Sequence, residues 1–572
     1  MTGNQFEIEI ILAGQPLKII DQKITNKVDL KNNIIATGVI IENCIFDDVV
    51  IFQDIDLNCG IKFINCIFKK SFSLNNCKAE NYEYEFNFNN SHLEFSNTTI
   101  EGLYFNGENE IQRGIDIQNN SIINSLKVET IICSIGSFQI NDSTVNNQFD
   151  IRLAKIINNI SIRGNSFINS KIRFENIQVN SFIFTDAKFN DDIYIWAGKV
   201  ENLIFNDGEF NDDLFITAVP ISQNLTVIGT VFKKSITFNL WDETNKKQGT
   251  LNKVHISSAK FGEQFIINGN NYEINEIVIK VSKQLEGALY FNSSNILNTK
   301  ISGDNYNSNI VFNHCNFNNL IFDFFYNYST LSIISAKSFG KNSIITIAHS
   351  NLGKFHFFNV FFNTFEKIKI FNSVLTEIIT ANVKWFDDNK LNTDSTTSHH
   401  TFEQKKEIYR QLKYALDKQG NRISSLHFKA LEMRTYKQES FIKVKWYKRI
   451  FNINRFVLWV GQTNDFGLNW LKPVLLSFLF LLIFHFLIIV GISDELSYSI
   501  NLNYCSLNRT WVIYSENFSS LPQLMNPTHI LSRIYPKNAN FSFIVHFLDY
   551  FLKIILAFFI FQTVSAFRKY MK

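Results

Sequence analysis

A short sequence pattern returns about every 22 residues through the first two thirds of this chain. The motif Asn-Cys-Ile-Phe at residues 43–46 returns at residues 65–68, and Phe-Asn-Asp-Asp at residues 189–192 returns at residues 210–213. Each copy runs into a short segment in which apolar and polar residues alternate, as in a β-strand. One such unit cannot bury its apolar face, whereas stacked copies enclose a continuous core. The pattern therefore predicts a mainly β fold, a parallel β-helix with one repeat per coil over residues 1–390.

One apolar position of the repeat can be traced along the chain. It is clearest in three successive copies, at Phe189, Phe210 and Phe232. We assign the following further residues to the same position: Ile100, Ile123, Val145, Phe167, Phe261, Phe317, Leu352 and Leu375. Asn is abundant throughout and suits the turns of such a coil, because it tolerates the left-handed backbone conformation and can form ladders between coils.

Acidic pairs recur at the predicted turns, at residues 47–48, 191–192 and 212–213. Strands of adjacent coils lie about 4.8 Å apart. This spacing places Lys69-Lys70 beside the first pair and Lys233-Lys234 beside the third. We interpret these residues as complementary charges on a solvated edge, each pair contributing little to stability, in preference to a metal or substrate site.

The sequence contains none of the common motifs of catalytic or metal-binding sites. The seven Cys form no CxxC or Cys/His metal spacing, and no common hydrolase, metalloprotease or nucleotide-binding motif is found. We therefore expect no enzyme, no catalytic or metal-ligating residues and no cofactor. A β-helical polysaccharide-cleaving enzyme is the alternative, disfavoured because no carboxylates cluster on one face. The net charge of +3 argues against a nucleic-acid partner.

The composition changes after residue 390, where residues 391–450 read as a helical connector. Thr401 and Gln404 have the spacing of a capping box, and Gly420 is a natural helix stop. A second helix is predicted from about Ser424 to Ser440, so that the two form a hairpin that we expect to cover the last coil. His399 and His400 could in principle bind a metal ion. Because no third ligand lies nearby in the sequence, we favour the interpretation that they belong to a linker.

Two apolar runs near the C-terminus, at residues 473–491 and 541–567, are long enough to cross a bilayer. Basic residues lie before the first run and in the tail at residues 568–572, whereas the loop at residues 492–540 carries few. The positive-inside rule therefore predicts a multi-pass membrane protein with both termini in the cytoplasm. The first residues lack the pattern of a cleavable signal peptide, which favours the same topology.

Basic and aromatic residues flank these spans, and residues 451–472 form a basic-aromatic segment that we expect at the membrane interface. An RNA-binding segment is the alternative, disfavoured by its position against a span. The predicted membrane anchor consists of Lys443, Lys445, Trp446, Lys448, Arg449, Arg455, Trp459, Arg568 and Lys569.

Four ionisable residues fall within the two runs, and such residues are costly in lipid. His485 lies in the first run. His546, Asp549 and Lys553 have the spacing of one helix face in the second. His485 and Asp549 lie at similar distances from the predicted outer boundary and could meet. We treat these residues as a candidate intramembrane polar face; the alternative is that they join the helices or reach the interface.

The C-terminal third resembles bacterial membrane-anchored pentapeptide-repeat-type proteins with a two-span, potassium-channel-related membrane region. The resemblance rests on Tyr409-Arg410-Gln411-Leu412-Lys413, on Asp465-Phe466-Gly467 before Lys472-Pro473, and on Ala566-Phe567-Arg568-Lys569. It implies a right-handed β-helix held at the bacterial inner membrane, with no catalytic residues to carry over. The first two thirds match a five-residue rhythm only loosely, and the loop between the spans lacks the TVGYG-like run of a potassium filter.

These observations favour a membrane-tethered scaffold or interaction protein whose repeat surface faces the cytoplasm. The expected partners are the lipid bilayer, an unidentified cytoplasmic protein and, as a possibility, further copies of the chain. The alternative is a channel-like effector, in which the β-helix senses a signal and the two spans form an oligomeric pore.

Overall fold

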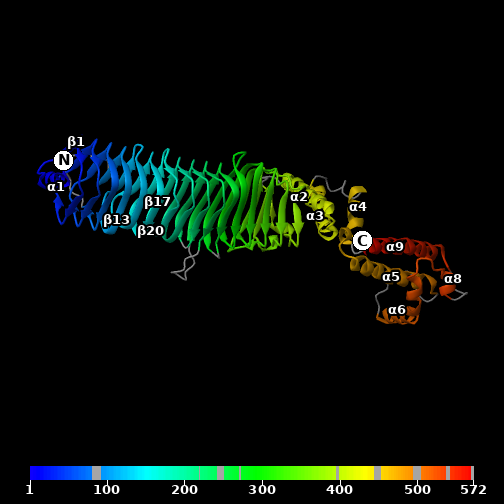
Figure 1. Cartoon of the computed structure of the whole chain (residues 1–572). Coiled ribbons are helices and arrows are strands. Elements are labelled where there is room, and N and C mark those ends of the chain that lie inside the picture. Colours follow the sequence, from blue (N-terminus) through cyan, green and yellow to red (C-terminus); the bar gives the residue numbers. More distant parts are fainter. Residues whose placement is uncertain are drawn as a thin grey trace. The chain divides into compact units, whose positions relative to one another are not determined.

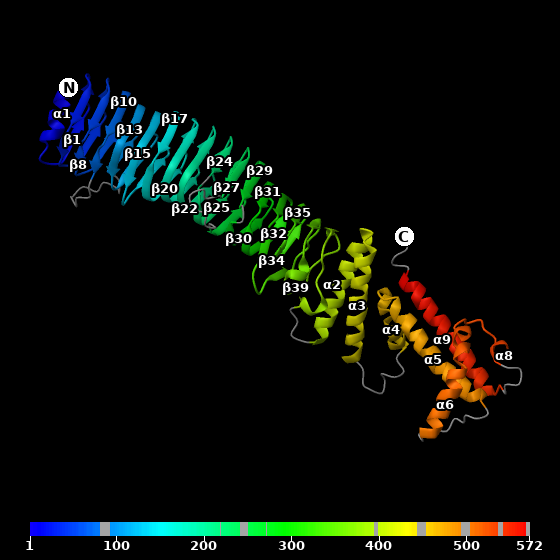
Figure 2. The same ribbon diagram turned by 90° about the horizontal axis from the view of Figure 1, so that it is seen from below.

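The computed structural model describes residues 1–79, 92–217, 219–240, 250–269, 272–393, 398–442, 453–493, 504–535 and 541–567. The chain forms two compact units, Met1–Asn392 and Thr393–Lys572 (Figures 1 and 2). The first unit is built of strands and the second of helices.

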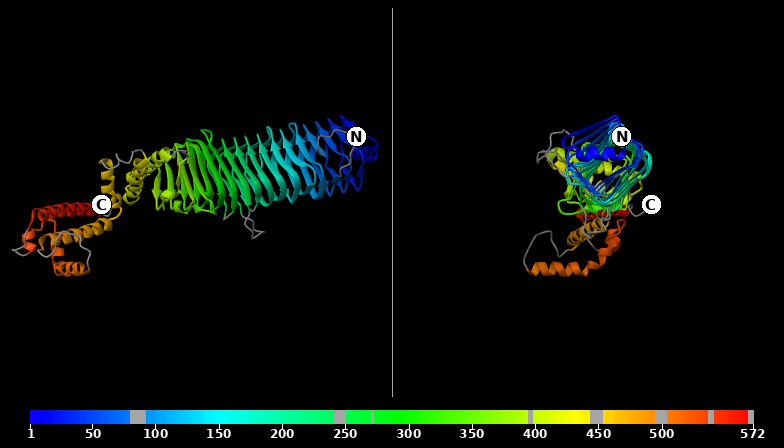
Figure 3. Two further views of the ribbon diagram at one scale, coloured as in Figure 1. Left: turned by 180° about the vertical axis from the view of Figure 1, so that it is seen from behind. Right: turned by 60° about the vertical axis from the view of Figure 1, so that its left-hand side comes forward.

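The first unit is a parallel β-solenoid of about 16 turns, which confirms the predicted β-helix. Strands of successive coils pair in register 22 residues apart, as Leu17 with Val39 and Val39 with Ile61. Every strand pair among the described residues is parallel. The stacked coils are seen along much of their length in Figure 3.

The first coils have four sides each, of which two are longer strands and two are short. In the first coil these are β1 (Leu17–Ile20), β2 (Lys23–Ile24), β3 (Val28–Lys31) and β4 (Ile34–Ile35). The next coil begins with β5 (Val39–Glu42), which pairs with β1, and β6 (Ile45–Phe46), β7 (Val50–Gln53) and β8 (Asp56–Leu57) pair with β2, β3 and β4.

The corners reveal a repeat half as long as the coil. Asn32, Asn43, Asp54, Asn65 and Asn76 follow one another at intervals of eleven residues, and all have φ between 49° and 56°. Asn and Asp adopt this left-handed conformation at less cost than other residues with a side chain. Each coil therefore consists of two similar halves, and the predicted 22-residue repeat contains two of them.

A small residue follows many of these corner residues and closes the turn. The Sγ of Cys44 and of Cys66 lies 3.3 Å from the carbonyl oxygen two residues earlier, and the Thr98 hydroxyl donates to the equivalent carbonyl at 3.0 Å. Cys44, Cys66, Cys77, Cys133 and Cys315 are buried free thiols. Most cysteines thus fill structural corners of the coil.

The inward side chains form apolar columns along the solenoid. Phe189 of β21 (Lys188–Phe189), Phe210 of β23 (Glu209–Phe210) and Phe232 of β26 (Val231–Phe232) stack with ring centroids 4.5 and 4.7 Å apart, and the column continues to Phe261. The apolar position traced in the sequence is therefore a real core column over these coils.

Two assignments to that column are wrong. The residue opposite Phe189 is Ile168 of β19 (Phe167–Ile168), which is buried, whereas Phe167 is 44% exposed. Phe317 pairs with Ile296 on the opposite short side of the coil. Phe167 is one residue out of register on the correct strand, whereas Phe317 belongs to the other half of the coil, which carries the same corner-and-apolar pattern.

Charged pairs at the turns follow the prediction in one case of two. Lys69 contacts Asp47 and Lys70 contacts Asp48, each at 2.7 Å, as expected. Lys233 instead contacts Glu209 at 2.6 Å, and not the acidic pair at residues 212–213.

Amide side chains at the corners form ladders along the outside of the coils. Asn43 donates to Asp21 at 3.0 Å, Asn65 to Asn43 at 3.1 Å and Asn97 to Asn65 at 2.6 Å. Each bond joins one coil to the next, so the ladder holds the coils in register from outside while the apolar columns hold them from inside.

A helix covers the first coil. Helix α1 (Gly3–Leu12) begins with a capping box between Thr2 and Gln5, and its Phe6 and Ile10 are buried. It packs on β3 and β4. The helix thus shields the core on the open side of the coil that contains β3 and β4.

The second unit opens with the predicted hairpin. Its helices are α2 (Ser398–Lys418) and α3 (Arg422–Ile442), and Tyr409 and Phe428 are buried between them. His399 and His400 lie in the first turn of α2, so the expectation that they form a linker is wrong. Packing of this hairpin on the solenoid stays a prediction.

Further helices lie among the described residues of this unit. They are α4 (Ile453–Gln462), η4 (Asp465–Gly467), α5 (Leu471–Ile492), α6 (Tyr504–Glu516), η5 (Phe518–Ser520), α7 (Leu521–Leu524), α8 (Leu531–Ile534) and α9 (Phe543–Phe567).

Candidate functional site

Helices α5 and α9 are long and apolar enough to cross a membrane. Their most apolar windows have mean hydropathies of 2.9 and 2.1, and little of either window is buried in the protein. The two helices lie side by side, with ring contacts between Trp470 and Phe567 at one end and between Phe484 and Phe551 nearer the other. They form an antiparallel pair whose outward faces are apolar.

The segment between the two helices folds back onto the halves of α5 and α9 that adjoin it. Leu521 and Leu524 of α7 and Leu531 of α8 join a buried cluster with Ile488 of α5 and Leu552 of α9. We call residues 517–535 the cap. The cap brings polar side chains to the two helices at the level of the predicted polar face.

Asp549 lies at the centre of one polar group. Its Oδ1 is 2.5 Å from Nε2 of His529 in the cap, and its Oδ2 accepts from Nζ of Lys553, one turn further along α9, at 2.7 Å. Asp549 and His529 are both buried. The Nδ1 of His529 lies 2.6 Å from the Asn526 carbonyl, which orients the ring. The carboxylate therefore meets a cation and an imidazole within one chain.

His485 of α5 belongs to a second polar group. Its Nε2 lies 2.9 Å from the Ser520 hydroxyl, which also lies 3.2 Å from the hydroxyl of Tyr535. All three side chains are buried. Burial raises the pKa of Tyr535, which keeps its O–H available as a donor.

The structure brings together some of the predicted residues and separates others. Asp549 and Lys553 form an ion pair, whereas His485 contacts the cap instead of Asp549. His546 is exposed, and its ring lies against Phe541. The partners His529, Ser520 and Tyr535 were missed, because they lie in a loop whose folding back onto the spans leaves no periodic pattern in the sequence.

Most of the predicted membrane anchor lies outside the described residues: Lys443, Lys445, Trp446, Lys448, Arg449, Arg568 and Lys569. Arg455 lies in α4, but its side chain is not described. Trp459 of α4 is 51% exposed and contacts Phe456, while Leu458 points inward. Helix α4 thus presents an aromatic outer face, as an interfacial helix would.

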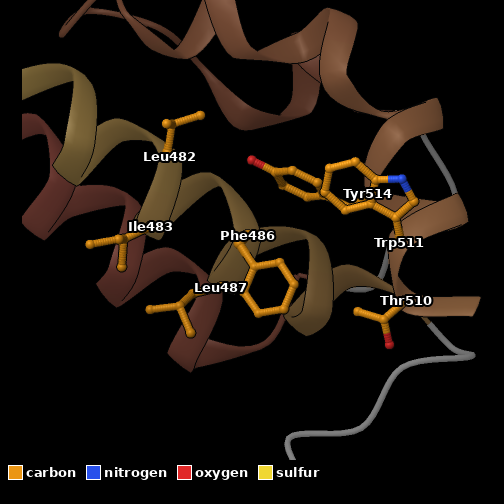
Figure 4. A pocket seen from close by; sticks show the side chains of 7 residues that line it. All are labelled: Leu482, Ile483, Phe486, Leu487, Thr510, Trp511 and Tyr514. Carbon is orange, nitrogen blue, oxygen red and sulfur yellow. The ribbon is translucent and has the colours of Figure 1, made fainter. Parts of the chain in front are cut away.

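An apolar groove of about 490 Å³ lies between α5 and α6 (Figure 4). Ile483 and Phe486 line it from α5, and Trp511 and Tyr514 line it from α6. Burial raises the pKa of Tyr514. The groove interrupts the apolar outer face of α5 and brings no charged group to it.

Among the described residues of the solenoid, three aspartates form an acidic cluster. Single carboxylate oxygens of Asp191, Asp192 and Asp212 lie within 4.8 Å of one another. Asp192 also contacts Nζ of Lys171 at 3.3 Å and accepts from the hydroxyl of Tyr194 at 3.1 Å. These contacts place a cation and a donor against the cluster, in line with its interpretation as part of a charged edge.

The chain was compared with protein-family models, with curated proteins and with solved structures, and none matches. The fold and the site therefore define a β-solenoid protein with two candidate membrane spans. They do not define a narrower family.

Proposed function

We propose that this chain is a non-enzymatic scaffold that displays its solenoid on the cytoplasmic side of the bacterial inner membrane. Helices α5 and α9 would hold it in the bilayer with both termini in the cytoplasm, and an unidentified cytoplasmic protein would bind the solenoid. The proposal extends the resemblance to membrane-anchored pentapeptide-repeat-type proteins. The stacked parallel coils agree with the β-helix that the resemblance implies, whereas the eleven-residue half-coil departs from a five-residue rhythm.

The pairing of Asp549 within one chain is the observation that carries the proposal. A carboxylate that lines a pore faces water or other subunits, and its charge remains available to passing ions. Asp549 is instead buried between His529 and Lys553. A span whose buried carboxylate is paired within the chain suits an anchor better than a pore.

The solenoid supplies the surface to be displayed. Its outer ladders and inner columns fix each coil to the next, so side chains on its long sides stand at regular intervals. Repeat proteins use such extended regular surfaces to bind partners. We therefore place the binding function on the solenoid.

A channel-like effector made of several copies is the alternative. The side chain of Lys553 is 27% exposed, and this ammonium is the group of the polar face that could reach a neighbouring copy. In this alternative the polar face opens when a signal binds the solenoid.

Membrane leakage separates the two functions. Conductance and dye release are measured in cells that produce the full chain, Asp549→Ala, or a version ending at Ile442. His546→Ala is the matched control, because it removes an exposed polar side chain from the same helix. A scaffold leaves membranes intact in all four strains at equal expression. Leakage that requires the spans and Asp549, but not His546, would contradict the proposal.

A further inference from the structure

The turn between α4 and α5 has an unusual backbone. Asp465, Phe466 and Gly467 form η4, with φ of 53°, 55° and 94°. Glycine adopts positive φ readily, whereas a bulky residue such as Phe466 rarely does. Such a conformation persists only where neighbouring structure holds it.

Helix α3 of the hairpin contacts this turn through side-chain hydrogen bonds. Nη2 of Arg434, on α3, donates to both carboxylate oxygens of Asp465, at 2.8 and 2.7 Å. One turn further along α3, Lys437 donates to the side chain of Gln462, the last residue of α4. This charged donor is shared by both oxygens of one carboxylate, and it holds Asp465 close to α3.

Helix α9 contacts the turn itself, and α5 contacts the end of α4 next to the turn. Asn464 is buried; its Oδ1 accepts from the Gly467 amide at 3.0 Å, and its Nδ2 donates to the Gln562 carbonyl of α9 at 3.3 Å. Lys472, in the first turn of α5, donates to the Gln462 carbonyl at 2.9 Å. The adjacent residues Asn464 and Asp465 thus contact α9 and α3, and Lys472 joins the start of α5 to the end of α4.

We propose that this turn is a coupling joint, through which the position of the hairpin α2–α3 sets the spacing of the two spans at their cytoplasmic ends. When Arg434 moves, Asp465 moves with it through the ion pair. Asn464 must then move as well, because the left-handed backbone of the turn is held in one conformation. Displacement of Asn464 changes the position of α9 relative to α5 near Trp470 and Phe567, whose rings lie 5.0 Å apart. The inference goes beyond tethering, because it gives the connector a means to transmit movement to the membrane helices.

Cross-linking across the inner ends of the spans tests the joint in the full chain. Cysteines replace Trp470 and Phe567, membranes are oxidised, and bond formation is followed as loss of thiols that react with a polyethylene-glycol maleimide. The chain with its native cysteines alone gives the background. Arg434→Ala and Asp465→Ala are expected to slow the reaction about fivefold each, the change in an equilibrium that about 1 kcal/mol produces.

The reversed pair, Arg434→Asp with Asp465→Arg, is expected to restore the rate to within about twofold, since it rebuilds the contact. Glu407→Ala is the control, because it breaks an exposed ion pair with Arg410 on α2 away from the turn. Unchanged rates in both single variants, or failure of the reversed pair to restore them, would overturn the joint. Recovery of each variant in the membrane fraction, measured on the same samples, reports separately on the proposed anchoring.

Discussion

A single corner residue carries much of the solenoid's geometry. Asn65 has φ of 52°, accepts from Asn97 and donates to Asn43. Its side chain thus joins three coils, while its backbone makes the corner that turns one strand into the next. Ladder and corner depend on the same residue type, which explains in structural terms why Asn recurs at these positions.

Asn65→Ala and Asn65→Gly separate the two roles. The alanine variant lacks the side-chain hydrogen bonds of the ladder. It also strains the corner, because a left-handed backbone at alanine costs about 1–2 kcal/mol of stability. The glycine variant lacks the ladder hydrogen bonds but adopts the left-handed corner without strain, so we expect it to destabilise the coil less than alanine does. Hydrogen exchange in β6 and in β10 (Ile67–Asn75) should show faster local opening for alanine than for glycine. Equal opening in both variants would show that the corner conformation contributes nothing.

Ile168 and Phe167 test which residue belongs to the core column. Ile168 is fully buried beneath Phe189, so Ile168→Ala is expected to lower the free energy of unfolding by about 2–5 kcal/mol. Phe167→Ala removes more atoms from an exposed position and should change it by about 0.5 kcal/mol or less. The midpoint of thermal unfolding checks both. A larger loss of stability for Phe167→Ala than for Ile168→Ala would mean that the strand register at β19 is wrong by one residue.

His92 makes the solenoid sensitive to acid. The amide of Arg113 donates to its Nδ1 at 3.1 Å, so that this nitrogen must stay unprotonated, and burial followed by the charge of Arg113 lowers the pKa of His92 to about 4. The unfolded chain takes up a proton near 6.5 and the folded chain only near 4. Stability is therefore lost as the pH falls from about 6.5 to 4.

His92→Gln keeps an acceptor but cannot be protonated in this range. The thermal midpoint of the variant should fall less between pH 7 and pH 4 than that of the natural chain. Asp116, whose pKa burial raises to about 6, acts in the opposite direction over part of this window in both proteins, so it cancels in the comparison. Identical pH profiles would contradict the role of His92.

Among the elements, the helical hairpin is fastened by ion pairs whose carboxylates are buried. Glu432 of α3 accepts from Lys413 of α2 at 2.7 Å, and Glu439 accepts from Lys406 at 2.8 Å. Burying a carboxylate is costly unless a cation accompanies it. The pairs therefore set how the two helices align, in addition to the apolar contact between Tyr409 and Phe428.

Lys413→Met should destabilise the hairpin by about 3–5 kcal/mol, because it leaves the Glu432 carboxylate without that cation. The double variant with Glu432→Leu is expected to recover most of the loss, since an apolar pair fills the same space. Limited proteolysis between α2 and α3 provides the measurement, with Glu407→Ala as the exposed control. A double variant as sensitive as Lys413→Met would contradict this account.

The element pattern of the chain could be predicted further than its contacts. The 22-residue period predicted stacked coils, but the two halves of a coil look alike in sequence, and so Phe317 was placed on the wrong side. Helical spacing predicted that Asp549 and Lys553 share a face. Their partner His529 could not be predicted, since it reaches them through the tertiary folding of the cap.

At the scale of the whole molecule, the division into two compact units gives the chain a natural cleavage point. Both candidate spans lie in the second unit, and the first unit ends at Asn392. A site for a specific protease inserted after Thr393 should therefore release the solenoid from membranes in soluble form, while α5 and α9 remain in the pellet. The core columns and the α1 helix belong to the released unit, so its β circular dichroism should persist.

The same insertion tests the proposed topology. If both termini lie in the cytoplasm, the protease should cut in inverted vesicles and leave the chain whole in intact spheroplasts. A second insertion, within residues 494–500 of the segment between the spans, should give the reverse result and is the matched control. Cleavage after Thr393 from outside the cell would place the solenoid beyond the membrane. A cytoplasmic partner would then be excluded, whereas the packing of the cap on α5 and α9 would stand, because it depends on contacts within the chain and not on which side of the membrane it faces.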